Sequence, residues 1–277
     1  MIETHALEQH PAFLKAQAIV RDALRKSLGV DWPKAVEILS AGHNVDLRGD
    51  FEMMVQLENC VLGLMKASPR YAGLKAVQFP VNIRIVHNVP PKGYLERPFA
   101  TDFPHCDVWS DAPADSTNIF LYLFMFGNCA TLELYESIEN HPYSRDYRGP
   151  YAGYTYDPAL FKHVPTSPAT GVMHLFDTYC PHKTVRGTDG LRISIDMRAR
   201  SNVPYVLNGG PMERERFSSY TPGVPGNGIY WSKPDKALDT FAAKCDFEMK
   251  QAAALGPWAV ALRDDYIDKI TKVGAFV

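Results

Sequence analysis

The first residues with types and spacing suited to chemistry form the stretch His105-Cys106-Asp107. In an extended chain, side chains two positions apart point to the same face. His105 and Asp107 would then present an imidazole and a carboxylate side by side, with Cys106 directed away. Both groups are ligands of divalent transition metals. So short a pattern often arises by chance, and taken alone it favours an ordinary pair on the surface or in a loop.

The segment 191–198, LRISIDMR, alternates apolar and polar residues. Its polar face holds Arg192, Ser194, Asp196 and Arg198. Such a face usually meets water, but inside a barrel with a site in its lumen it can point inward while the apolar face meets covering helices. An inward Arg192 and Ser194 would offer a guanidinium and a hydroxyl to a carboxylate ligand.

Three histidines lie between these two motifs, namely His163, His174 and His182. His174, in the apolar stretch MHLF, is predicted to be a core histidine, whereas His182 lies ten residues before Arg192. The set His105-x-Asp107, His182 and Arg192-x-Ser194, spread over a β-rich region, resembles the iron(II)/2-oxoglutarate-dependent oxygenases. The stretch PHCDVWSD followed by TNIFLYL is similar to secondary-metabolite enzymes of that superfamily, including the phytanoyl-CoA-hydroxylase-like branch. The resemblance covers residues 81–200.

The resemblance implies a ligand set and two cosubstrates. His105, Asp107 and His182 would bind Fe(II) as a facial triad. Arg192 and Ser194 would hold the far carboxylate of 2-oxoglutarate, and O2 would be the second cosubstrate. The implied activity is hydroxylation of a small-molecule metabolite, coupled to decarboxylation of 2-oxoglutarate to succinate. Related halogenases replace the triad carboxylate by a small residue, so the retained Asp107 favours hydroxylation, desaturation or ring closure over halogenation.

Other residues of the same region are weaker candidates. Tyr122 and Thr131 could hydrogen-bond 2-oxoglutarate, although Tyr122 fits a place in the core equally well. Arg186 is a second candidate for the cosubstrate arginine, but it falls in a Thr/Gly/Asp turn and is expected to be exposed to solvent. The candidates for substrate binding are Arg84, Trp109, Asn118 and Arg145.

The elements that must position these residues follow from hydrophobic patterning. Helical spacing predicts helices over 5–28, 33–41 and 52–67, and again over 234–254 and 257–272. Between them lie short β-branched and aromatic segments separated by Pro and Gly, at 81–88, 117–126, 130–137, 170–177 and 191–199. Short strands must close or double up to protect their edges. We therefore predict a mainly β protein with helical flanks around a double-stranded β-helix, that is, a cupin-like jelly-roll core.

The expected organisation is a single oxygenase domain over residues 1–277. Residues 1–75 would form the helical N-terminal flank, 76–200 the jelly-roll core, and 201–277 a closing segment with the C-terminal helices. The segment 138–168 contains five tyrosines and is long for a loop inside a compact domain. Such loops are usually functional, so we expect it to form a lid over the site.

The composition limits the kinds of partner and the location that the protein could have. The chain has 277 residues with a formal charge of -2, which argues against nucleic acid as a general partner. Its apolar runs are shorter than the roughly 20 residues of a membrane helix, and its start, MIETHALEQH, does not resemble a secretory signal. The five cysteines are odd in number and never form C-x-x-C, so buried reduced thiols are expected. These features predict a cytoplasmic protein.

Alternative functions remain open at this stage. One is a cupin-type metal-dependent dioxygenase or isomerase without 2-oxoglutarate, for which the Arg192-x-Ser194 pair has no evident use. Another is a non-catalytic β-barrel binding protein with structural histidines. A protein-modifying hydroxylase is less favoured, because no charge pattern points to a polypeptide substrate. The amphipathic helical ends also offer a surface for a homodimer.

Overall fold

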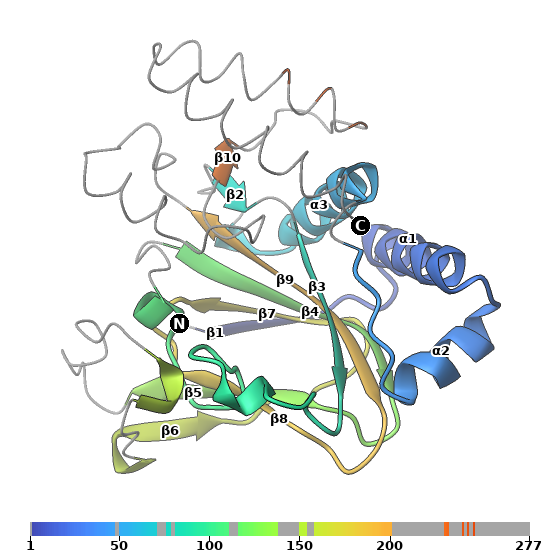
Figure 1. Cartoon of the computed structure of the whole chain (residues 1–277). Coiled ribbons are helices and arrows are strands. Elements are labelled where there is room, and N and C mark those ends of the chain that lie inside the picture. The colour runs from blue at the N-terminus through green and yellow to red at the C-terminus, as the bar shows by residue number, and fades with distance from the viewer. Residues whose placement is uncertain are drawn as a thin grey trace. The chain divides into compact units, whose positions relative to one another are not determined.

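The computed structural model of the protein describes residues 2–47, 50–70, 76–78, 81–110, 116–137, 150–153, 158–200 and 230–232, with isolated positions 240, 243 and 246. Its helices are α1 (Pro11–Leu28), α2 (Trp32–Ser40) and α3 (Phe51–Met65). Its strands are β1 (Ile2–Ala6), β2 (Ala76–Gln78), β3 (Asn82–His87), β4 (Ser116–Phe126), β5 (Thr131–Ser137), β6 (Phe161–Val164), β7 (Val172–Asp177), β8 (His182–Val185), β9 (Leu191–Arg200) and β10 (Tyr230–Ser232) (Figure 1). The chain divides into two compact units, Met1–Ala6 with Val36–Asn44 and Arg84–Ile195, and Leu7–Ala35 with Val45–Ile83 and Asp196–Val277.

The first unit holds two antiparallel sheets. One has the strand order β1-β7-β4-β9, with β3 also paired to β9, and the other has the order β6-β5-β8. From β4 onward the chain passes from the first sheet to the second (β5, β6), back (β7), across (β8) and back again (β9). This alternation is the topology of a jelly roll, in which two sheets share one core. The predicted double-stranded β-helix is therefore confirmed.

The second unit contains helices α1 and α3 and the first residues of α2. Helices α1 and α3 pack against each other, and Gly63 of α3 lies so close to α1 that an added Cβ would be 3.2 Å from the Cβ of Ala12. The C-terminal end of β9 pairs with β2, and β2 pairs with β10.

The N-terminal helix is shorter than predicted. Residues 5 and 6 belong to β1, which pairs with β7, and α1 begins only at Pro11. His10 is the N-cap, and its Nδ1 accepts a hydrogen bond from the backbone N–H of Ala12. Proline at the first helical position is a start signal, so the expectation of a helix from residue 5 was wrong. Helix α1 ends where predicted, at Gly29 with a φ of 67°.

The remaining predictions of elements compare closely where the chain is described. Helices α2 and α3 and the strands β3, β4, β5, β7 and β9 lie within two residues of the predicted bounds. Strand β6 lies inside the segment 138–168 that was predicted to be a loop, and it pairs with β5. The predicted C-terminal helices fall outside the described residues. No described helix has both the length and the apolar character needed to cross a membrane.

Candidate metal centre

Two of the three predicted metal ligands face each other across a strand pair. His182 is the first residue of β8, and His105 lies beside it on the second sheet's edge. Each backbone N–H of the pair donates to the other's carbonyl oxygen at 2.9 Å. Asp107 follows His105 and begins the 3-10 helix Asp107–Ser110. The chain turns after Cys106, so Asp107 reaches the histidines from a helical turn and not from an extended strand as predicted.

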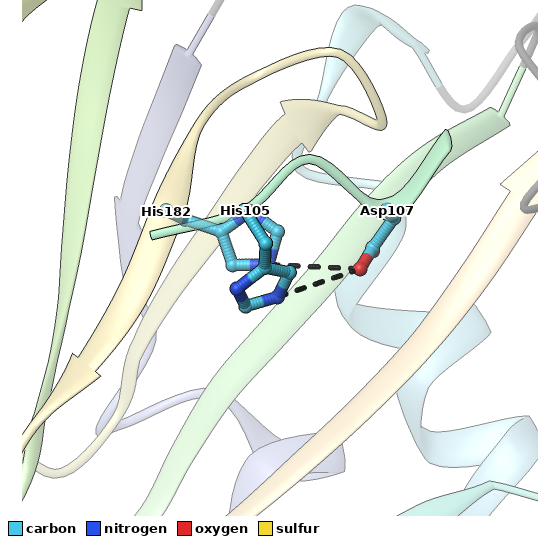
Figure 2. Close-up of side chains that lie close together, drawn as sticks. All are labelled: His105, Asp107 and His182. Atoms are coloured by element: carbon cyan, nitrogen blue, oxygen red, sulfur yellow. Dashed lines mark ion pairs between the residues drawn. The ribbon is translucent and has the colours of Figure 1, made fainter. Parts of the chain in front are cut away.

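The three side chains converge in a buried position (Figure 2). Asp107 Oδ1 lies 3.8 Å from His105 Nε2 and 3.7 Å from His182 Nε2. These separations exceed a hydrogen bond, and the three candidate ligand atoms all lie within 4.8 Å of one another. His105 is 1% exposed, Asp107 7% and His182 8%. Separations of this length suit three groups that bind one ion between them better than three groups that hydrogen-bond to each other.

The hydrogen bonds of both imidazoles fix them in the form that binds a metal. His105 Nδ1 donates to the carbonyl oxygen of Phe103 at 2.8 Å, and His182 Nδ1 donates to that of Cys180 at 2.9 Å. A proton on each Nδ1 leaves the lone pair of Nε2 directed at Asp107. Backbone partners of this kind orient histidine ligands in metalloproteins. Burial lowers the pKa of His105 to about 3, so its imidazole is neutral at physiological pH. The donor set of two imidazoles and a carboxylate fits a non-haem iron(II) ion.

Aromatic rings pack against both histidines. The ring of Phe176 on β7 meets the His182 ring at 5.0 Å and an interplanar angle of 63°, and the ring of Tyr151 is stacked on His105. Cys106 points away from the triad as predicted, and its thiol donates to the carbonyl oxygen of Tyr179 at 3.2 Å. Neither ring was predicted as a site residue by itself: no local motif marks Phe176, whereas Tyr151 belongs to the tyrosine-rich segment 138–168 that was expected to cover the site.

The polar pair of β9 is buried in the same unit. Arg192 is 1% exposed and Ser194 is 0% exposed, and the intervening Ile193 is buried as well, so both faces of this strand are covered. The guanidinium of Arg192 lies 5.3 Å from the ring centroid of Phe120 on β4. Among the described residues, Ser194 Oγ has no hydrogen-bond partner. A buried guanidinium beside a hydroxyl can bind an anionic group such as a carboxylate.

Tyr122 lies next to this pair, whereas Thr131 lies farther along the second sheet. The Tyr122 hydroxyl accepts a hydrogen bond from the backbone N–H of Leu132 at 2.7 Å and keeps its own proton for donation. Burial raises the pKa of Tyr122 to about 12, so the phenol stays neutral. Thr131 is half-buried and pairs with Val185, three pairs from the Leu134–His182 pair, which corresponds to roughly 10 Å.

Three of the four substrate candidates lie in the first unit. Asn118 is 6% exposed and directly opposite Phe176, and its Nδ2 has no hydrogen-bond partner within the described chain. Trp109 is 1% exposed and packs in a cluster with Cys106 and Tyr151. Arg84 is half-buried on β3. Arg145 lies outside the described residues.

Two other sequence predictions have clear outcomes. His174 is a core histidine as predicted, since it is 0% exposed and its Nδ1 is hydrogen-bonded to Thr4 Oγ1 at 3.0 Å. Arg186 was predicted to be solvent-exposed, and this was wrong. Its guanidinium binds both carboxylate oxygens of Asp102, at 2.6 and 3.1 Å, and also donates to the carbonyl oxygen of His87. These partners lie far away in sequence, so the local turn pattern did not reveal them.

No known protein-family model and no curated protein matches the chain. Several solved structures resemble it. The apo form of ThoJ, a non-heme monooxygenase, aligns over 94% of this chain and 92% of its own at 10% identity, with a TM-score of 0.43. SnoN, a non-heme alpha ketoglutarate dependent epimerase from nogalamycin biosynthesis, aligns over 72% of this chain and 76% of its own at 9% identity, with a TM-score of 0.37.

A prolyl-4-hydroxylase from Pseudomonas putida aligns over 72% of this chain and 87% of its own at 14% identity, with a TM-score of 0.37. These similar structures are oxygenases and an epimerase. Likenesses at this level assign no activity to the chain, so the functional argument rests on the side chains themselves.

Proposed function

We propose that this protein is an iron(II)- and 2-oxoglutarate-dependent oxygenase that hydroxylates a small-molecule metabolite. One observation carries the proposal. His105, Asp107 and His182 converge in a buried position with both Nδ1 atoms tied to backbone carbonyls, so three metal-binding atoms are directed at one point. A structural cluster of buried polar groups would instead be expected to satisfy its members by mutual hydrogen bonds.

In this proposal, His105 and His182 hold iron(II) through Nε2, and Asp107 holds it through a carboxylate oxygen. The bound iron and 2-oxoglutarate would supply the oxidising power with O2. The contribution of the protein is to fix the ligands and to exclude water. Both functions follow from burial and from the backbone hydrogen bonds of the two imidazoles.

The proposed site for the far carboxylate of 2-oxoglutarate is formed by Arg192 and Ser194. The Phe120 ring under the guanidinium restrains its plane, and a carboxylate would accept hydrogen bonds from Arg192 and from the Ser194 hydroxyl. Tyr122 is proposed to donate its phenolic proton to the same anion, and the hydrogen bond that its hydroxyl accepts from Leu132 supports this because it leaves that proton free. Thr131 is proposed as a further contact to the cosubstrate.

For the substrate we propose contacts from Asn118, Trp109, Arg84 and Arg145. Asn118 is the best supported of these, because its Nδ2 is buried, has no partner in the described structure, and lies on the strand next to the Phe176–His182 contact. We also propose that 138–168 closes over the site as a lid. We propose a cytoplasmic location, because the cytoplasm suits a small-molecule enzyme of nearly neutral charge with reduced cysteines. We also propose that the helical flanks form a homodimer surface.

The experiment that tests the function is an anaerobic titration of the metal-loaded protein. Iron(II) with 2-oxoglutarate should give a weak visible charge-transfer band in the wild-type protein. Asp107→Ala should abolish the band, and it should also abolish the succinate release that wild type shows once O2 is admitted, because it removes a ligand. Glu136→Ala, which removes an exposed carboxylate from β5, is the matched control and should change neither.

The titration also separates the alternatives. Iron bound in stoichiometric amount without any band would favour a cupin-type enzyme that does not use 2-oxoglutarate. A protein that binds no metal would be a binding module, and the proposal would be wrong. Normal turnover by Asp107→Ala would refute the ligand assignment.

A further inference from the structure

A tyrosine within the segment 138–168 packs directly on a proposed metal ligand. Tyr151 lies in the 3-10 helix Tyr151–Gly153 and is 4% exposed. Its ring is stacked on the imidazole of His105, with the ring centroids 3.9 Å apart and the ring planes 14° apart. The stack is therefore nearly parallel, and it covers one face of the imidazole.

The position of this ring is set by the chain segment before the metal site. The backbone N–H of Tyr151 donates to the carbonyl oxygen of Pro98 at 2.7 Å. The ring of Phe99 meets the Tyr151 ring edge-on, with centroids 5.2 Å apart and an interplanar angle of 74°. Phe99 is itself 48% exposed, so a run of three rings leads from the surface through Tyr151 to the buried His105.

The imidazole of His105 needs a second restraint. Its hydrogen bond from Nδ1 to Phe103 holds one edge of the ring, but a single bond leaves the ring able to tilt. A parallel aromatic face opposes that tilt, because rotating the imidazole would break the stack or drive it into Tyr151. The direction of Nε2 toward Asp107 then depends on both contacts.

We infer that Tyr151 is a positioning residue that orients His105 and strengthens metal binding; this rests on the proposed function. An imidazole bound to a cation through Nε2 becomes electron-poor, whereas the face of a phenol ring is electron-rich. The stack therefore gains strength when the metal binds. By linkage, the metal must in turn stabilise the docking of Tyr151 on Pro98 and Phe99.

The test is a titration of the metal-free protein with Co(II), followed by its visible absorption. Tyr151→Leu should raise the Kd for Co(II) by about tenfold, the lower end of what is seen when residues supporting a ligand are lost. Tyr151→Phe keeps the stacked ring and should bind Co(II) within about threefold of wild type. Phe124→Leu, which removes a buried ring from β4, is the matched control for lost core packing. It should lower Tm without changing the Kd for Co(II).

A second readout follows from linkage. At saturating Co(II), the rise in Tm over the metal-free protein should be smaller for Tyr151→Leu than for wild type. A tenfold weaker Kd corresponds to about 1.4 kcal/mol less stabilisation by the ion. A residue with only a structural role would lower the metal-free Tm and leave this increment unchanged.

The outcomes separate this inference from the function on which it rests. If wild type binds one equivalent of Co(II) and Tyr151→Leu binds it with the same Kd, the inference about Tyr151 is wrong and the proposed function stands. If Tyr151→Phe loses as much affinity as Tyr151→Leu, the hydroxyl and not the stack is responsible, which also overturns it. If the wild-type protein binds no Co(II), both fail together.

Discussion

Mild acid should destabilise this protein in part through a histidine that is not one of the proposed metal ligands. His174 on β7 is 0% exposed, and burial lowers the pKa of its imidazole from 6.5 to about 4. The folded protein therefore keeps His174 neutral at a pH where the unfolded chain would protonate it. We expect His174→Gln, which keeps a hydrogen-bonding group near Thr4 but cannot titrate, to remove this sensitivity to acid.

The sign and size follow from the two pKa values. Above pH 6.5 the group is neutral in both states and has no effect. As the pH falls from 6.5 to about 4, only the unfolded chain gains the proton, so the free energy of unfolding drops. At about 1.4 kcal/mol for each unit of pKa difference, the loss is about 2 kcal/mol at pH 5 and about 3 kcal/mol at pH 4. Below that pH the folded state also binds the proton and the loss stops growing.

The assay is urea unfolding of the metal-free protein between pH 7.5 and pH 4.5. The lowered pKa of His105 steepens the wild-type curve too, so the difference between wild type and His174→Gln is the quantity to compare. Between pH 7.5 and pH 5, the free energy of unfolding of wild type should fall by about 2 kcal/mol more than that of the variant. Thr4→Val removes the hydrogen bond but leaves His174 able to titrate, so it should keep the wild-type slope. Parallel curves for wild type and His174→Gln would refute the reasoning.

Three further predictions concern the cosubstrate site and the fold. Arg192→Ala should raise the 2-oxoglutarate concentration for half-maximal succinate release by at least about tenfold, because it removes a buried charged hydrogen-bond donor. Arg186→Ala should lower the free energy of unfolding by about 2 kcal/mol, because it leaves the Asp102 carboxylate largely buried without its guanidinium. Gly187→Ala should cost about 3 kcal/mol or more, measured by urea unfolding, because the added Cβ would overlap the backbone carbonyl of Asn128.

Each of these has a result that would contradict it. An Arg192→Ala enzyme with an unchanged requirement for 2-oxoglutarate would remove this residue from the cosubstrate site. Arg21→Ala, which removes an exposed partner of Asp22, should change stability by less than about 0.5 kcal/mol. An equally small effect of Arg186→Ala would show that the Asp102 pair contributes little. A Gly187→Ala protein as stable as wild type would mean that the turn can move away from Asn128.

The sequence predicted those strands whose own pattern identifies them. Strand β4 has an apolar and aromatic run of residues, and β9 alternates polar and apolar side chains, so local patterning was sufficient for both. Strands β1 and β8 are short and carry no strong pattern. Strand β1 takes its conformation from pairing with β7, which lies far away in the chain. Strand β8 takes its conformation from pairing with β5, which lies about fifty residues earlier. Local propensity is a weak signal for such strands.

In the candidate site, too, the sequence predicted what lies close together in the chain and missed contacts between distant segments. The spacing within His105-x-Asp107 and Arg192-x-Ser194 was readable because each pair lies within a few residues. The contacts of Tyr151 with His105, and of Arg186 with Asp102, join residues from separate parts of the chain. No pattern in one sequence predicts which rings or charges will meet across a fold, so these contacts could be found only from the structure.

The reciprocal backbone hydrogen bonds between His105 and His182 make the three ligand positions differ in how easily their residues can be replaced. The two histidines face each other in a β-bridge with both backbone hydrogen bonds made, a pairing that holds the Cα atoms about 5.5 Å apart whichever side chains are present. Asp107 lies outside the ladder, on a helical turn. Evolution or engineering could therefore exchange the residue at position 107 without disturbing the other two ligands. New reactivity would be expected to arise there first, on a histidine frame that stays constant.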